Sequence, residues 1–248
     1  MSGHSKWSKI KRGKAITDAK RGKIFSKMAR IISVAAREKG PDPKFNPSLR
    51  MAIEKAKEAN MPNDNIDRAI AKASGGDGDT TMEEFLYEAY GPGGIALLIE
   101  GLTDNKNRTL TEIKNILNKN NAKFVESGGV KYLFQRKGVI IVSNEQKNLG
   151  QDNLELAVIE AGAENIKLRE DNTLEVHTPV ETMEEVRNNL ERKNIPVESF
   201  SLDWVAANEI EITSEKTKEQ IEKLVDALEE QDDVNEIYSN LKSQLAVE

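Results

Sequence analysis

The residues with the clearest chemical potential form a run of cations at the start of the chain. Residues 1–37 contain eleven Lys or Arg and a single acid, Asp18, although the whole chain has a formal net charge of -6. Clustered cations of one sign are typical of polyanion binding, because the phosphates of nucleic acids or the head groups of anionic lipids offset their mutual repulsion. The side chains expected to contact nucleic acid are Lys6, Trp7, Lys9, Lys11, Arg12, Lys14, Lys20, Arg21, Lys23, Lys27 and Arg30.

The second half of this run is predicted to form an amphipathic helix over residues 17–39. At about 100° per residue, apolar side chains such as Ile24, Met28 and Ile32 share one arc, and we expect the opposite arc to face away from the core. That opposite arc carries Lys20, Lys23, Lys27, Arg30 and Arg37. A merely solvated helix face is the alternative interpretation, although such faces usually mix both signs of charge. Trp7, among the preceding lysines, either stacks on a base or anchors the segment to its own domain.

Catalytic and metal chemistry have little support in the composition. The chain has no Cys and two His, His4 and His177, which excludes disulfides, thiolate zinc sites and cysteine nucleophiles. A Ser-His-Asp triad would have at most one folded histidine. No Walker A or G-x-G-x-x-G pattern occurs, and Gly91-Pro92-Gly93-Gly94 is predicted to be a turn between two strands. We therefore expect a protein that is not an enzyme and that has no metal and no cofactor.

A second polar segment has the composition of an anion site. Its residues are Asn105, Lys106, Asn107, Arg108 and Thr109, which precede a predicted helix. The free N–H groups at a helix start favour a negatively charged ligand. An ordinary polar loop with an Asn or Thr cap explains the same residues equally well. Both interpretations of this candidate anion contact stay open.

Charge divides the chain into two unequal parts. Residues 1–72 carry 18 basic and 7 acidic side chains, and residues 73–248 carry 18 basic and 35 acidic ones. The acidic part would repel nucleic acid, so such contacts are expected in the N-terminal part. The sequence has no apolar run of 18 residues and no apolar h-region near its start. We therefore expect no membrane span, no signal peptide and a cytoplasmic location.

Hydrophobic periodicity predicts an α+β protein of three domains. Residues 1–74 are expected to form a basic α-helical domain of three helices, over 17–39, from Asn46-Pro47 onward and over about 63–73. A Gly-rich linker follows at 74–79. Two ferredoxin-like α/β domains come next, one inserted into the other: residues 80–135 plus 204–248, and residues 136–203. The first of these is assigned strands at 95–99, 130–134, 209–212 and 234–238, and residues 85–90 are predicted to be strand-like.

Five short motifs resemble the YebC family of bacterial proteins, to which the mitochondrial translational activator of cytochrome oxidase also belongs. They span nearly the whole chain in the family's order: Gly3-His4-Ser5-Lys6-Trp7, the Lys-Arg-Gly-Lys-Ile-Phe run at 20–25, Asn60-Met61-Pro62, Tyr90-Gly91-Pro92-Gly93-Gly94 and residues 102–109. Two places depart from the family pattern, Ala89 and Asn120-Asn121-Ala122, where the family tends towards Gly; both concern loop conformation in the acidic part.

The resemblance implies three domains around a cleft, a cytoplasmic location and a probable transcriptional regulator that binds DNA. It also links family members to translation on the ribosome, including relief of stalling at proline-rich stretches. It implies no cofactor and no catalytic activity.

We interpret the chain as a non-enzymatic regulator of gene expression whose basic N-terminal domain contacts the phosphate backbone of DNA. One alternative changes the polymer: a ribosome-associated translation factor that binds rRNA or tRNA and relieves stalling. A second alternative is a protein-interaction adaptor whose basic helix meets an acidic partner. In each case we expect the acidic domains to position the protein or to bind a protein partner, without contact to a membrane.

Overall fold

The structure, a computed structural model, describes residues 18–74, 82–143, 151–169 and 173–242. These residues fall into two compact units, one from the residues before 134 together with 206–242, and one from 134–205. Within the first unit we call residues 18–74 the helical region, and residues 82–133 with 206–242 the sheet region. Part of the predicted basic site lies outside the described residues, namely Lys6, Trp7, Lys9, Lys11, Arg12 and Lys14, as does the predicted linker beyond Ser74.

The helical region contains the three predicted helices, α2 (Asp18–Lys39), α3 (Pro47–Glu58) and α4 (Asn63–Ser74). Asn46 caps α3 by accepting a hydrogen bond from the Leu49 N–H at 3.0 Å. Its amide also donates to the carbonyls of Ala35 and Gly40, so one buried side chain joins the end of α2 to the start of α3. The apolar faces of the helices close over a common core that includes Met28, Ile32, Leu49, Ile66 and Ala69.

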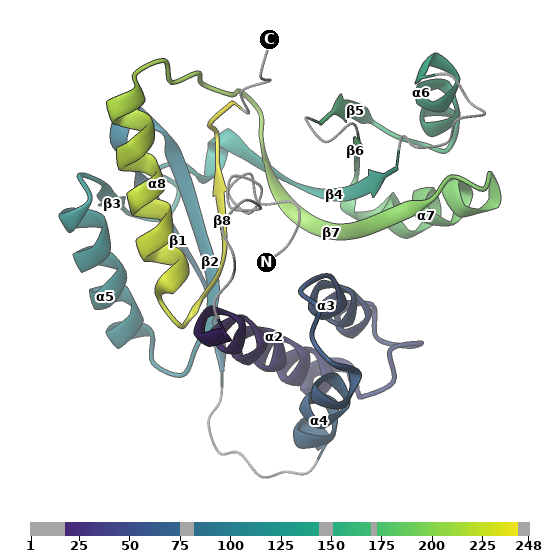
Figure 1. Cartoon of the computed structure of the whole chain (residues 1–248), viewed down its shortest axis with the longest axis horizontal. Helices are drawn as coiled ribbons and strands as arrows, with labels where there is room; N and C mark the ends of the chain where they lie inside the picture. Colours follow the sequence, from purple (N-terminus) through teal and green to yellow (C-terminus); the bar gives the residue numbers. More distant parts are fainter. Residues whose placement is uncertain (1–17, 75–81, 144–150, 170–172, 243–248) are drawn as a thin grey trace. The chain divides into compact units, whose positions relative to one another are not determined.

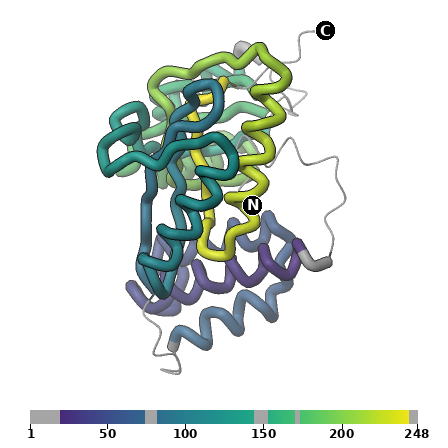
Figure 2. Tube along the Cα trace, turned by 90° about the vertical axis from the view of Figure 1, so that its left-hand side faces the viewer, coloured from purple at the N-terminus to yellow at the C-terminus, as the bar shows by residue number. Residues whose placement is uncertain are grey.

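The sheet region is a four-stranded antiparallel sheet with two helices on one face (Figure 1). Its strand order is β3 (Lys123–Val125), β1 (Glu83–Tyr90), β2 (Ala96–Thr103) and β8 (Val234–Ser239). Helices α5 (Lys106–Lys119) and α8 (Glu215–Glu230) lie side by side over it, as Figure 2 also shows, and bury Ile113, Leu117, Leu224 and Leu228. Strands β1 and β2 pair as a hairpin across the short turn η1 (Pro92–Gly94), where the sequence predicts a turn.

Two predicted strands of the sheet region are wrong. Residues 131–133 form the 3-10 turn η2 (Lys131–Leu133), because the buried carboxylate of Glu88 accepts hydrogen bonds from the N–H groups of Gly128, Val130 and Lys131 at 2.7–2.8 Å. Those N–H groups therefore cannot join a sheet. Burial opposes the charge of Glu88, but the three bonds outweigh it and lower its pKa. Residues 209–212 contribute only an isolated bridge between Ile210 and Leu241. The sheet instead contains β1 and β3 beside β2 and β8.

The second unit has the predicted βαββαβ order. It consists of β4 (Phe134–Val142), α6 (Gln151–Glu160), β5 (Asn165–Leu168), β6 (Leu174–Thr178), the turn η3 (Val180–Thr182), α7 (Met183–Arg192) and β7 (Val197–Ala206). The spatial strand order β5-β6-β4-β7 is that of a ferredoxin-like sheet. The α+β class, with three helices followed by two sheet-and-helix domains, is therefore confirmed. Among the described helices, none has the length and apolar character needed to cross a membrane.

Candidate nucleic-acid interface

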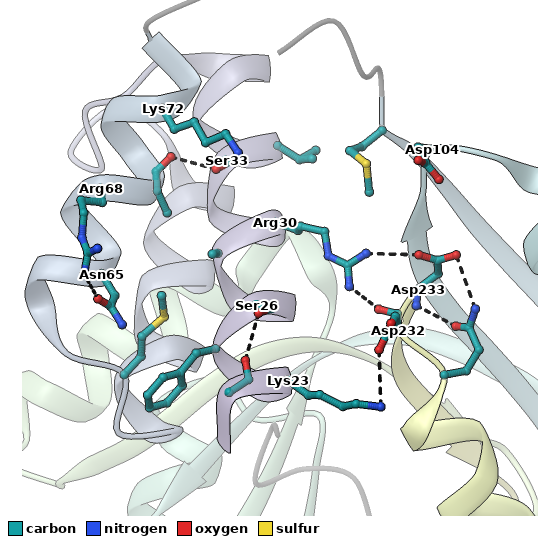
Figure 3. Close-up of a pocket in the computed structure, with 18 of the residues that line it drawn as sticks. Lys23, Ser26, Arg30, Ser33, Asn65, Arg68, Lys72, Asp104, Asp232 and Asp233 are labelled. Atoms are coloured by element: carbon teal, nitrogen blue, oxygen red, sulfur yellow. Dashed lines mark hydrogen bonds and ion pairs between the residues drawn. The ribbon is translucent and has the colours of Figure 1, made fainter. Parts of the chain in front are cut away.

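A groove of about 1330 Å³ lies between the helical region and the sheet region of the first unit (Figure 3). Its lining includes residues from three of the motifs singled out in the sequence. These are Gly22, Lys23 and Phe25 of α2, Met61 before α4, and Asp104 and Arg108 near the start of α5. Packing of α2 against α4 and contact of α2 with the residues between α8 and β8 bring them together. The groove is the place where distant motif residues converge.

Cations line one side of the groove, and the other side is lined mainly by carboxylates, with the Arg108 guanidinium among them. The cations of α2 and α4, here called the basic wall, are Lys23, Arg30, Arg37, Arg68 and Lys72. The carboxylates of the sheet region, here called the acidic wall, are Asp104, Glu112, Glu230, Asp232 and Asp233. Figure 3 shows Arg68 and Lys72 on α4 and Asp104 across the groove, whereas Lys23 and Arg30 reach from α2 towards Asp232 and Asp233.

Lys27 does not face solvent as the helical wheel predicts. Its residue is 9% exposed, and its ammonium donates to the carbonyl oxygens of Glu229, Gln231 and Val234, each at 2.7 Å. Burial, followed by the neighbouring cation of Arg30, lowers the pKa of Lys27 from 10.5 to about 8. The expectation of an exposed Lys27 is wrong because these three carbonyls replace water around the ammonium. Lys27 anchors the helical region to the residues that join α8 to β8.

Arg30 binds the same turn through a buried carboxylate. Its Nη1 donates to Oδ1 of Asp233 at 3.1 Å, and its Nη2 donates to the carbonyl of Asp232. Asp233, which is 4% exposed, also accepts from Arg108 at 2.9 Å and from Thr109 at 2.6 Å. Burial raises the pKa of Asp233, but the bonds from Thr109 and Arg108 outweigh burial and keep the pKa below its ordinary value. One carboxylate therefore connects α2 with α5.

The predicted anion contact at residues 105–109 already binds a carboxylate of the same chain, that of Asp233. Asn105 caps α5 by accepting the Arg108 N–H at 3.1 Å, and the Arg108 guanidinium binds Asp233, which raises the pKa of Arg108. Thr109 is fully buried on the same carboxylate, so it is not accessible to an external ligand. The remaining predicted contacts, Lys106 and Asn107, are exposed.

The other described members of the predicted site remain accessible. Lys20, Arg21 and Lys23 are exposed. Lys20 Nζ lies 3.8 Å from a carboxylate oxygen of Glu230, and Lys23 Nζ lies 3.7 Å from one of Asp232. Exposed pairs of this kind contribute about 0–1 kcal/mol, so a phosphate competes with them easily.

Three cations of the basic wall were not among the predicted contacts. Arg37 is in the last turn of α2, and Arg68 and Lys72 are four residues apart on α4. The i,i+4 spacing places Arg68 and Lys72 on one helix face. Their position opposite the carboxylates depends on the packing of α4 against α2, which periodicity within either helix does not reveal. Within the described part of the chain, no group of three or more His, Cys, Asp or Glu is placed to hold a metal ion.

Comparison with known proteins identifies the family. Residues 5–76 match the model of the TACO1/YebC protein N-terminal domain, and residues 82–241 match that of the TACO1/YebC second and third domain. A probable transcriptional regulatory protein of Halothermothrix orenii is 48% identical over 240 residues, which cover 97% of this chain and 94% of the relative. A probable transcriptional regulatory protein of Bacillus subtilis is 47% identical over 243 residues, which cover 98% of this chain and 100% of the relative.

A solved structure is also similar to this chain over nearly its whole length. The crystal structure of a conserved hypothetical protein from Aquifex aeolicus has a TM-score of 0.81 and 42% identity, covering 96% of this chain and 97% of that chain. The chain therefore belongs to the TACO1/YebC family.

Proposed function

We propose that this protein is a non-enzymatic regulator of gene expression that binds nucleic acid, in the first instance DNA, through its helical region. The observation that carries the proposal is the basic wall, where cations from two helices line one side of a groove. The names of the relatives, probable transcriptional regulatory proteins, supply the regulatory part.

The charge of the helical region supports this proposal. Residues 18–74 contain 13 Lys or Arg and 7 acids, and the cations Lys20, Arg21, Lys23, Arg37 and Lys72 are exposed. Phosphate contacts from such side chains supply most of the sequence-independent affinity for nucleic acid. The predicted cations of residues 6–14 precede α2 in the sequence and add to the positive charge of the N-terminal part.

RNA is the second candidate polymer. The family models that match the chain are named for TACO1 as well as YebC, and the resemblance of the five sequence motifs to this family implies a link with translation. The phosphates of either polymer can pair with the cations of the basic wall. A protein partner on the acidic domains stays a prediction in both cases.

Direct binding and sedimentation test the proposal together. Labelled duplex DNA and labelled RNA of equal length are titrated with the full chain at two salt concentrations, and we expect binding that weakens steeply as salt rises. Sedimentation of a cell lysate with and without nuclease then separates the candidates: nuclease-sensitive migration with ribosomes supports RNA, and migration with DNA supports transcription. Absence of binding to both polymers would overturn the proposal and leave the protein adaptor.

A further inference from the structure

We propose that the groove holds an unpaired stretch of polynucleotide, with its phosphates on the basic wall and its base edges towards the acidic wall. This inference rests on the proposed function and specifies the form of nucleic acid that the groove takes. Single-stranded RNA and unpaired DNA share the required chemistry.

The cations of the basic wall that have no ion pair with a described carboxylate of the sheet region lie towards one end of it. Figure 3 shows residue numbers rising in the same direction along both helices, from Lys23 to Ser33 on α2 and from Asn65 to Lys72 on α4. The Ser33 hydroxyl donates to the carbonyl of Ala69 at 2.8 Å, which fixes the two helices at that level. Arg37 follows Ser33 by one helical turn, so it lies towards the same end as Lys72.

Arg37 and Lys72 are the cations best placed to take phosphates. Both are exposed, and neither has a hydrogen bond or ion pair to another residue in the described ranges. Arg30, in contrast, is held by Asp233. Arg68 lies on α4 one helical turn before Lys72. It donates to the carbonyl of Asp64 at 3.1 Å, and this hydrogen bond orients its guanidinium. A phosphate on Arg37 and Lys72 therefore displaces no partner within the described ranges.

The acidic wall distinguishes a single strand from a duplex. Asp104 is paired with Arg108 at 2.7 Å, so the carboxylates left to repel a phosphate are mainly Glu112 and Glu230. A duplex carries phosphates on both strands, so a duplex entering the groove would bring its second row of phosphates towards these two. Like charges in such contact repel. A single strand has one row of phosphates and can turn its base edges to the opposite side. Carboxylates accept hydrogen bonds from the amino groups of bases, as Asp and Glu do from cytosine.

The lining of the groove also has apolar side chains, which suit the faces of bases. They include Phe25, Val34, Met61 and Met82. Unpaired bases stack on aromatic rings and pack on apolar groups in proteins that bind single strands. The volume of about 1330 Å³ exceeds the roughly 300–1,000 Å³ of sites that enclose one drug-sized ligand. The groove therefore has room for more than one nucleotide.

The test compares two double variants of the full chain with the unaltered protein. Arg37→Gln with Lys72→Gln neutralises the available part of the basic wall, and Lys39→Gln with Lys44→Gln removes two exposed cations of the same region that do not line the groove. Labelled single-stranded RNA, single-stranded DNA and duplex DNA of one sequence are titrated at two salt concentrations. We expect the unaltered protein to prefer a single strand, and the groove variant to lose about tenfold in affinity and about 1.4 in the salt slope, near 0.7 for each lost phosphate contact. The control variant should lose much less.

A third variant tests the acidic wall. Glu112→Gln with Glu230→Gln should raise the affinity for duplex several-fold and reduce the preference for single strands. Unchanged melting temperatures exclude unfolding as the cause of any loss.

The outcomes separate this inference from the proposed function. If the unaltered protein binds no polynucleotide, the proposed function fails. If it binds nucleic acid but prefers duplex, or if the groove variant behaves as the Lys39 and Lys44 control, the groove assignment fails while the proposed function stands. The RNA and DNA single strands show which polymer supplies the unpaired segment.

Discussion

Arg30 and Asp233 are separated by 203 positions in the sequence, yet Arg30 Nη1 donates to Asp233 Oδ1 at 3.1 Å. The carboxylate is almost fully buried, whereas the arginine side chain is 31% exposed. Removing one partner of a buried ion pair is strongly destabilising, because it leaves the other charge uncompensated. The attachment of the helical region to the sheet region therefore depends on this ion pair as well as on the three carbonyl contacts of Lys27.

Acidification should loosen this attachment. The folded-state pKa of Asp233 lies below its ordinary value of 3.8, so its contribution to the free energy of unfolding is complete above that value and is lost as the pH falls through the folded-state pKa. We expect the free energy of unfolding to fall more steeply with decreasing pH in the unaltered protein than in Asp233→Asn, which cannot titrate there. Urea unfolding from about pH 6 to about pH 3 measures both slopes. Parallel slopes would show that another group controls the acid transition.

Replacing Lys27 by Met should destabilise the protein by about 2–4 kcal/mol. The variant preserves much of the apolar volume but leaves the carbonyls of Glu229, Gln231 and Val234 without their donor. Lys39→Met is the matched control, because Lys39 is exposed on the same helix and its replacement should change stability by less than about 0.5 kcal/mol. Equal urea midpoints for the two variants would contradict the anchoring role of Lys27. The same result bears on nucleic-acid binding, because a loss of binding in a Lys27 variant has to be separated from a loss of structure.

Two glycines of the first unit should respond to alanine in opposite directions. A Cβ on Gly101 in β2 would lie 2.0 Å from the carbonyl oxygen of Asp233 and 2.6 Å from the Phe85 ring, so Gly101→Ala should cost about 3 kcal/mol or more. Gly22 in α2 has nothing within 4 Å of such a Cβ, and Gly22→Ala should stabilise the helix by about 0.5–1 kcal/mol. Thermal unfolding of the two variants provides the comparison. A tolerated Gly101→Ala would mean that β2 and the residues before β8 do not approach closely enough to exclude a methyl group.

The second unit should fold as a separate fragment. Residues 134–205 contain a complete βαββαβ set with all four strands of one sheet. We expect the isolated fragment to give a mixed helix and strand circular dichroism spectrum and one cooperative urea transition. A random-coil spectrum would show that this unit needs the rest of the chain. In the complementary experiment, replacing these residues by a short linker should preserve the secondary structure of the first unit.

Local sequence signals predicted most elements because their causes are local. The helices α2, α3 and α4 follow from apolar periodicity and from the Asn46 cap, and the strand order of the second unit follows from the alternation of strand and helix signals. Residues 130–134 have the composition of a strand, but Glu88, about forty positions earlier, takes up their N–H groups. No pattern within the segment itself contains that information.

The candidate site shows the same limit more strongly. A helical wheel groups Lys27 with the exposed cations, because it gives the direction of each side chain around the helix axis. It does not show which other segments of the chain pack against that side of the helix. The carbonyls that receive its ammonium belong to residues 229–234, and Asp233 holds Arg30 in the same turn. The groove depends on these contacts, because they hold α2, against which α4 packs, next to the start of α5. Which residues line each side of the groove is therefore decided by tertiary packing, and the charge distribution along the chain indicates it only in part.

The buried contact of Lys27 also has a consequence for the order in which the protein is made. Glu229, one of its acceptors, follows Lys27 by 202 residues, so at about 5–20 residues per second the acceptor is synthesised on the order of 10–40 s later. Throughout that interval α2 has neither these carbonyls nor the Asp233 carboxylate beside it. A growing chain should consequently present Lys27 and Arg30 to any nearby polyanion, and completion of the α8–β8 turn withdraws both cations from it.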